Sequence, residues 1–309
     1  MNDKLKKVGL TALAGSLAAT TGYAGDMSVS GSWGVSFDPG NAGTNTGNAL
    51  TLNDSITFSG SGDSDYGTVA VSYELDTTGV LDDLKATLDM GDSGKLTFGE
   101  SAGGSGIRAV KNIVPHADTP VYSMSATTTA YGVVGGTGQT GYMGYDVTMG
   151  DMTLSLDTSK ATGGTDRSAS ISYTGIDGLQ VVAGAGEENT AGTSQTDTTT
   201  FGAKYTMGSV TAGVQMSEKD DTSTSNADED GTHVGVSFAM SDSLSVSYGQ
   251  NETEFSETTK VDETVSGIGL SYTAGSMSIN AYAGKTENDK GSSTSSDVET
   301  KGITISFSF

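Results

Sequence analysis

The chain has 309 residues, of which only 34% are hydrophobic, and it carries a formal charge of −23 with no Cys. So little apolar mass is poorly suited to a soluble domain of this length, which is normally closer to half apolar. The acidic balance argues against a nucleic-acid partner, and the lack of Cys excludes a disulfide scaffold and a Cys-ligated metal site.

The N-terminus has the features of a secretory signal. Three Lys fall in the first seven residues, an apolar and small-residue run follows at 8–19, and Gly22-Tyr23-Ala24 is a small-x-small cleavage site. A short amphipathic helix is the alternative. The run is too short to cross a bilayer of roughly 30 Å as a helix. We therefore expect residues 1–24 to be a signal peptide and residues 25–309 to form one exported domain.

Sixteen segments of the mature chain alternate between apolar and small or polar residues. They lie near 27–37, 50–59, 66–76, 82–89, 94–100, 139–148, 151–158, 168–174, 178–186, 199–206, 209–217, 231–239, 243–250, 264–273, 276–285 and 297–309. A period of two predicts strands with one apolar and one polar face. Seven short turns alternate with eight mostly longer polar loops. The pattern predicts an all-β fold, a transmembrane antiparallel β-barrel of 16 strands with long external loops and short periplasmic turns.

Aromatic residues fall near both ends of the predicted strands. Those near the turns are Phe58, Tyr173, Tyr205, Phe238, Tyr272 and Phe309, and those near the loops are Tyr73, Phe98 and Tyr248. The two aromatic girdles of a membrane barrel would produce this distribution, although aromatic residues favour strands in any case.

Four short motifs, in this order, carry a resemblance to a known family. They are MSVSG at 27–31, ITFSG at 56–60, GKLTFGE at 94–100 and ISFSF at 305–309. Together with the sixteen-segment layout, they make the mature chain resemble the Gram-negative general-diffusion porins, most of all the sixteen-stranded alphaproteobacterial type. The resemblance implies an outer-membrane homotrimer, surrounded by lipid, in which the third external loop folds into each pore. It also implies that the barrel-assembly machinery reads the C-terminal strand.

The long loop at 101–138 holds a small charged cluster made of Arg108, Lys111, His116 and Asp118. It follows the fifth predicted strand, where the family places its pore-narrowing loop. We expect these four residues to form a charged lip on the pore constriction. The alternative is a surface loop with scattered charge.

The alternation also assigns charged residues to the lumen wall. Because the Leu residues of the fourth and fifth strands face lipid, the residues between them face the lumen. The resulting wall set is Glu74, Asp83, Lys85 and Lys95, and Asp146, Asp157 and Lys204 fall on the same face elsewhere. Lumen and mouth are net negative by this assignment, so we expect a mild preference for cations.

The second predicted strand departs from the family in two ways. Where relatives often carry wall arginines, this chain has Thr51 and Asn53. Asp54 then interrupts the lipid face, and a carboxylate bare to lipid at mid-membrane is costly, although less so than Lys or Arg. Either the strand register slips there, or Asp54 lies in the contact between subunits.

We expect no tightly held cofactor and no catalysis. Acidic residues cluster in loops at 220–221, 228–230 and 252–257, where carboxylates either bind Ca²⁺ loosely or form a solvated, repulsive surface. The only His residues, His116 and His233, are far apart in sequence. Catalysis in a barrel would need a His with carboxylate or Ser partners in one cleft.

Passive transport of ions and small hydrophilic solutes is therefore the predicted function. A substrate-specific channel of the same fold is one alternative, but it would need a track of aromatic residues in the lumen, and only Tyr142 and Tyr282 are clear inward aromatics. A surface β-protein without a pore, such as an adhesin, is the other. It does not explain the terminal aromatic strand or the alternation of loops and turns.

Overall fold

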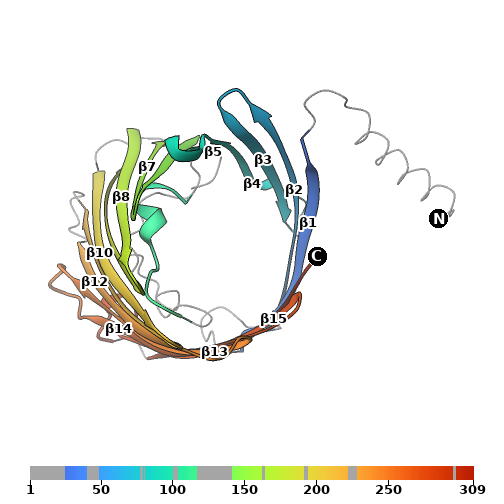
Figure 1. Ribbon diagram of the computed structural model, residues 1–309. Helices are drawn as coiled ribbons and strands as arrows, with labels where there is room; N and C mark the ends of the chain where they lie inside the picture. The colour runs from blue at the N-terminus through green and yellow to red at the C-terminus, as the bar shows by residue number, and fades with distance from the viewer. Residues whose placement is uncertain are drawn as a thin grey trace.

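The computed structural model describes residues 25–39, 49–76, 79, 81–99, 104–116, 141–161, 164–190, 194–221, 228–294 and 297–309. Sixteen antiparallel strands close into one barrel, in which each strand pairs with its sequence neighbours and β1 pairs with β16 (Figure 1). The predicted 16-stranded barrel is confirmed. Within the described ranges, no helix is long and apolar enough to cross a bilayer. The expected signal peptide, residues 1–24, lies outside them.

The sequence locates all sixteen strands but underestimates several of their external ends. The strands are β1 (Met27–Phe37), β2 (Leu50–Ser64), β3 (Gly67–Asp76), β4 (Leu81–Asp89), β5 (Lys95–Gly99), β6 (Tyr142–Met149), β7 (Met152–Ala161), β8 (Gly164–Ile176), β9 (Leu179–Thr190), β10 (Ser194–Met207), β11 (Val210–Asp221), β12 (Glu229–Ser241), β13 (Leu244–Phe255), β14 (Glu263–Ala274), β15 (Met277–Glu287) and β16 (Val298–Ser308). At the external ends of β10, β11 and β13 both faces become polar, so the alternation fades while the backbone ladder continues.

Large apolar side chains cover the outer face of the barrel. Trp33 of β1 is 43% exposed and Ile268 of β14 is 60% exposed, as expected for side chains that face lipid. Few hydrophobic side chains of the described chain are buried. Four of the seven are Ile107, Val110, Ile113 and Val114, all in the third loop. The apolar mass inside the barrel therefore comes mainly from this loop.

The β1–β2 ladder is continuous from Met27 opposite Gly60 to Phe37 opposite Leu50. Within it, Asp54 lies opposite Trp33 and is exposed on the outer face. The alternative of a register slip at Asp54 is therefore wrong.

The C-terminal strand closes the barrel and brings its terminal aromatic residue into the ladder. Gly31 donates its backbone N–H to the carbonyl of Phe309 at 2.9 Å, and Phe309 donates back to Gly31 at 3.0 Å. The rings of Trp33 and Phe307 lie side by side on the outer face, with centroids 6.1 Å apart. The closing seam thus combines backbone pairing with aromatic packing.

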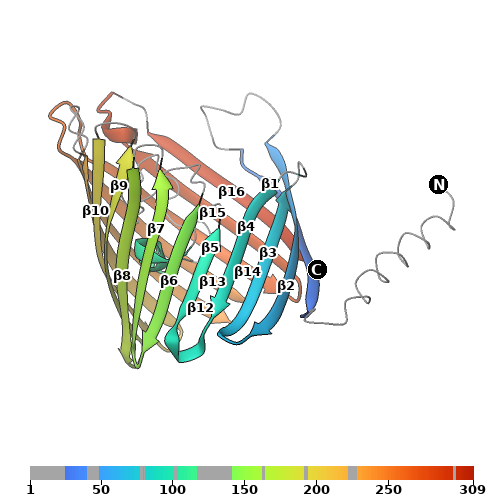
Figure 2. The same cartoon turned by 90° about the horizontal axis from the view of Figure 1, so that it is seen from above.

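Short turns gather at one end of the barrel, as Figure 2 shows for the connections from β2 to β3 and from β4 to β5. The predicted turns at Gly178 and Gly208 are present, with φ of 74° and 60°, a region that residues with a side chain rarely adopt. The aromatic assignment is wrong at one point. Phe58 and Tyr73 lie directly opposite each other in the β2–β3 ladder, so they do not belong to opposite girdles.

Candidate pore site

The described part of the third loop runs along the inner wall of the barrel. This part, residues 104–116, contains a short 3-10 helix, η2 (Gly106–Val110), which lies against the inner side of β7, β8 and β9 (Figure 1). Farther along, Val114 and Pro115 lie over Gly213 of β11 and Gly235 of β12. The prediction that loop three folds into the barrel is confirmed.

Hydrogen bonds to β6 and β7 hold the start of the described segment. Ser105 donates its backbone N–H to Tyr142 Oη at 2.9 Å and its hydroxyl to Asp146 Oδ2 at 2.7 Å. Gly106 donates its N–H to Ser155 Oγ at 2.8 Å, and Ser155 donates in turn to Asp146. Asp146, which the alternation places on the inward face, therefore orients two hydroxyl groups that hold the loop.

A second set of hydrogen bonds joins η2 to β8. Ile107 donates its N–H to Ser168 Oγ at 2.8 Å, and Ser168 donates its own proton to Asp157. Ser170 donates to the carbonyl oxygen of Gly106 at 2.5 Å. The N–H groups at the start of a helix have no partner within it, and here the hydroxyls of Ser155 and Ser168 accept those of Gly106 and Ile107.

Gln215 on β11 clamps the middle of the segment. Its amide oxygen accepts the N–H of Ile113 at 3.2 Å, and its amide nitrogen donates to the carbonyl of Val110 at 3.0 Å and to Thr200 Oγ1 at 2.9 Å. The side chain is fully buried. Sequence reasoning missed this residue, and a lone Gln on the inward face of a predicted strand was the only available signal.

Glycines on the lumen face make room for the apolar underside of the loop. A Cβ placed on Gly184 of β9 would lie 2.9 Å from Ile107 Cγ1 and 3.2 Å from Val110 Cγ2. On Gly202 of β10 it would lie 2.6 Å from Ile113 Cδ1. Such distances leave no room for a side chain. Glycine at these positions therefore lets the loop pack directly against the backbone of the strands.

The charged residues of the loop lie at different depths. Arg108 is partly buried, and this burial lowers the pKa of its guanidinium. Among the neighbouring groups that raise this pKa, the negative charge of Asp157 has the largest effect. Lys111 is exposed, and its pKa is lowered by partial burial and then by the charge of Arg108. His116 is exposed at the end of the described segment. Asp118 lies outside the described residues.

The four predicted wall residues gather on β3, β4 and β5. Glu74 lies opposite Asp83 in the β3–β4 ladder, and Lys85 lies opposite Gly99 of β5. Gly99 in turn lies opposite Tyr142, whose hydroxyl contacts the loop inside the barrel, so this face is the lumen face. Lys95 shares that face, opposite Asp146 of β6. The structure thus places all four on one stretch of wall, beside the strands that hold the start of the loop.

The acidic residues of the external strand ends form rows rather than a cage. Asp197 of β10 lies between Glu187 and Asp220 in register, and Asp230 of β12 lies between Glu218 and Glu254. In the part of the chain that the structure describes, no group of three or more His, Asp or Glu is arranged to hold a metal ion.

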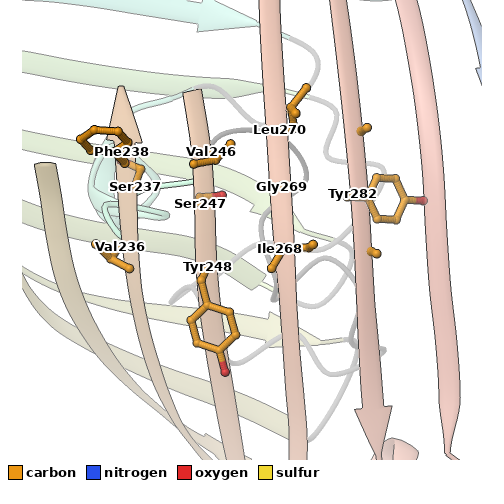
Figure 3. Close-up of a pocket in the computed structure, with 12 residues that line it drawn as sticks. Val236, Ser237, Phe238, Val246, Ser247, Tyr248, Ile268, Gly269, Leu270 and Tyr282 are labelled. Atoms are coloured by element: carbon orange, nitrogen blue, oxygen red, sulfur yellow. The ribbon is translucent and has the colours of Figure 1, made fainter. Parts of the chain in front are cut away.

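The outer wall carries a shallow apolar hollow of about 550 Å³ across β12 to β15 (Figure 3). Val236, Tyr248 and Ile268 line it (Figure 3), whereas Tyr282 of β15 lies opposite Gly269 and alternates with residues of that face, so its side chain belongs to the other side of the sheet. Tyr282 Oη donates to Asp38 Oδ1 at 2.8 Å. The hollow belongs to the lipid-facing surface, and the inward assignment of Tyr282 agrees with the structure.

Comparison with known proteins places the chain in a family. A family model described as Gram-negative porin matches residues 8–292. The chain therefore belongs to the Gram-negative porin family, and it is an outer-membrane channel protein. A search among curated proteins found no match by sequence.

Solved structures share the fold at low sequence identity. OmpT, an outer membrane protein of Vibrio cholerae, matches with a TM-score of 0.71 at 14% identity, covering 92% of this chain and 97% of that one; it has also been solved in a trimer form. A porin refined at 1.8 Å matches with a TM-score of 0.69 at 13% identity over 92% and 100% of the two chains. A mutant of the Rh. blastica porin matches with a TM-score of 0.64 at 12% identity, covering 92% of this chain and 100% of that one.

Proposed function

We propose that this porin is a general-diffusion channel that lets ions and small hydrophilic solutes cross the outer membrane passively. The observation that carries the proposal is the third loop, which hydrogen bonds and apolar contacts hold against the lumen wall. A loop held in this way narrows a water-filled passage, and its charges bias which solutes pass. The mechanism needs no catalytic step and no input of energy.

Single-channel recording in a planar bilayer tests this proposal. We expect stepwise openings, in groups of three, with a current that is linear in voltage. We also expect many different small solutes to pass through the same channel. A folded, heat-modifiable barrel that shows no conductance would contradict the proposal.

A substrate-specific channel is less well supported. The two inward aromatics are engaged in the structure itself, because Tyr142 accepts a hydrogen bond from Ser105 and Tyr282 donates one to Asp38. In the described residues they do not form a continuous track. Saturable flux of a single substrate would favour this alternative. A surface protein without a pore does not fit a member of the porin family.

We infer a mild preference for cations. On β3 to β5 the predicted wall residues balance, with Glu74 and Asp83 against Lys85 and Lys95. Farther around the lumen face, Asp146 and Asp157 add negative charge near η2. A fixed negative field in the lumen attracts cations. A reversal potential that favours chloride in a KCl gradient would contradict this inference.

Replacing Arg108 by Gln is expected to strengthen that cation preference. The guanidinium supplies positive charge to the loop and interacts with Asp157. Without it, the negative charge of that carboxylate is no longer offset, and the lumen becomes more negative. The reversal potential in a KCl gradient should move farther in the direction that favours potassium. Arg167→Gln is the matched control, because the only other Arg of the chain is exposed and pairs with Glu187 at 3.3 Å. An equal shift in both variants would contradict the role of Arg108.

We propose that the chain assembles as a homotrimer, as OmpT does in its trimer form, and that Asp54 lies in the subunit contact. An exposed carboxylate among apolar residues of the outer face is easier to accommodate against protein than against lipid.

Asp54→Val is then expected to lower the temperature at which the trimer dissociates in SDS, because a polar contact between subunits is lost. Asp63→Val, on the same strand but on its other face, serves as the control. An Asp54→Val trimer that is unchanged or more stable would show that Asp54 faces lipid.

We also propose three features that complete the biogenesis and surroundings of the porin. Residues 1–24 would be removed on export, the barrel-assembly machinery would read β16, and lipid would cover the apolar outer face. No resident cofactor and no nucleic-acid partner is proposed. Carboxylates at the external strand ends would bind Ca²⁺ only loosely, so chelation of Ca²⁺ should leave conductance unchanged.

A further inference from the structure

The only two His residues of the chain lie at neighbouring places of the lumen in the folded barrel. His116 directly follows Pro115, whose carbonyl oxygen would lie 3.1 Å from a Cβ placed on Gly235 of β12. His233 lies on the same face of β12, two residues before Gly235. The two residues are far apart in sequence, but the fold brings the end of the described loop segment to the strand that carries His233.

A third polar side chain lies beside this pair. Asn251 of β13 is directly opposite His233 in the β12–β13 ladder. Both side chains are buried, since Asn251 is fully buried and His233 is only 2% exposed. Asn251 donates its amide nitrogen to Thr253 Oγ1 at 3.1 Å, but its buried Oδ1 accepts no hydrogen bond. A buried oxygen left in this way loses its hydration without gaining a hydrogen bond in exchange, which is unfavourable. A ligand that uses its lone pairs would recover part of that cost.

These three side chains match the preferences of one class of ion. Neutral imidazole nitrogen is the commonest metal ligand in proteins, and it suits Zn²⁺, Ni²⁺ and Cu²⁺, whereas Ca²⁺ and Mg²⁺ prefer carboxylate and carbonyl oxygens. Two imidazole nitrogens and an amide oxygen leave a position for water on a four-coordinate ion. Because the protein supplies only three of the four ligands, we expect the bound ion to exchange with the solution.

We propose that His116, His233 and Asn251 form a binding site for a divalent transition-metal ion, with Zn²⁺ as its representative, inside the barrel. An ion bound to both imidazoles ties loop three to β12 and adds positive charge to the lumen. The site differs in place and chemistry from the carboxylate rows at the external strand ends.

Calorimetric titration of the full mature protein in detergent with ZnCl₂ tests the site independently of channel activity. We expect one ion bound per chain, with an affinity that excess CaCl₂ leaves unchanged. His116→Gln and His233→Gln should each weaken binding by roughly tenfold or more, since even the loss of an outer partner of a ligand costs 10–100-fold. Lys111→Gln, on the same loop, is the control and should bind as the unaltered protein does.

Absence of stoichiometric Zn²⁺ binding to the unaltered protein would overturn the proposal, as would His variants that bind with unchanged affinity. Loss of the Zn²⁺ signal in CaCl₂ would also overturn it, because that result assigns the ion to the acidic rows. If His233→Gln does not fold, His116→Gln decides the question, because His116 is exposed and its replacement disturbs no buried packing.

Discussion

Replacing Gln215 by Leu is expected to give a larger and noisier open-channel current. The substitution leaves the N–H of Ile113 and the carbonyl of Val110 without their partner, and each buried group left unsatisfied costs roughly 1–3 kcal/mol. The cheapest way to recover those hydrogen bonds is for the loop to move off the wall and meet water. Single-channel recording measures both the mean current and its fluctuation.

Gln180→Leu is the matched control for this experiment. Gln180 also lies on the wall of the barrel and makes a side-chain hydrogen bond, to Ser172 Oγ at 3.1 Å, but it does not contact the loop in the described structure. Its current should equal that of the unaltered protein. If Gln215→Leu conducts no more than Gln180→Leu, Gln215 is not the clamp that holds the loop.

Replacing Gly184 by Leu should have the opposite effect and reduce the conductance. A Cβ at this position would lie 2.9 Å from Ile107 Cγ1, and a Leu side chain would extend farther into the space under η2. Overpacking of this kind costs roughly 1–3 kcal/mol, which displacement of η2 toward the axis of the barrel relieves. Because the loop remains hydrogen-bonded at Ser105 and Ile113, we expect it to shift inward rather than detach.

Gly60→Leu provides the comparison for that variant. Gly60 lies on the outer face of β2, where the nearest atom to an added Cβ is Met27 Cγ at 3.9 Å, so a larger side chain meets open space. Its conductance should be unchanged. A Gly184→Leu channel whose conductance equals that of Gly60→Leu would show that the loop does not narrow the passage at η2.

The sequence predicts the barrel well because alternation is a local property. Each strand shows its two faces within its own ten or so residues, as in β1, where Trp33 and Phe37 face out and Ser32 and Ser36 face in. The number of strands, their order and the length of the connections follow from counting such segments. The inward placement of Asp146 and Asp157 also follows from parity alone.

Parity stops being informative where both faces are polar or where an irregular segment begins. It does not reveal the external ends of β10 and β13, because a polar residue there has no preferred side. It also does not reveal which of the many inward Ser, Thr and Gly residues support the loop. These residue types alternate with apolar ones along the whole barrel, and each fits the pattern equally well.

By itself, then, the sequence determined a sixteen-stranded membrane barrel with a polar lumen and a long third loop that carries Arg108 and Lys111. Only the tertiary structure decided where that loop rests. Gln215 meets Ile113 across 102 residues of sequence, and Pro115, next to His116, lies over Gly235 of β12 across a similar interval. Closure of the barrel sets which distant residues meet, since it depends on the register of every strand at once.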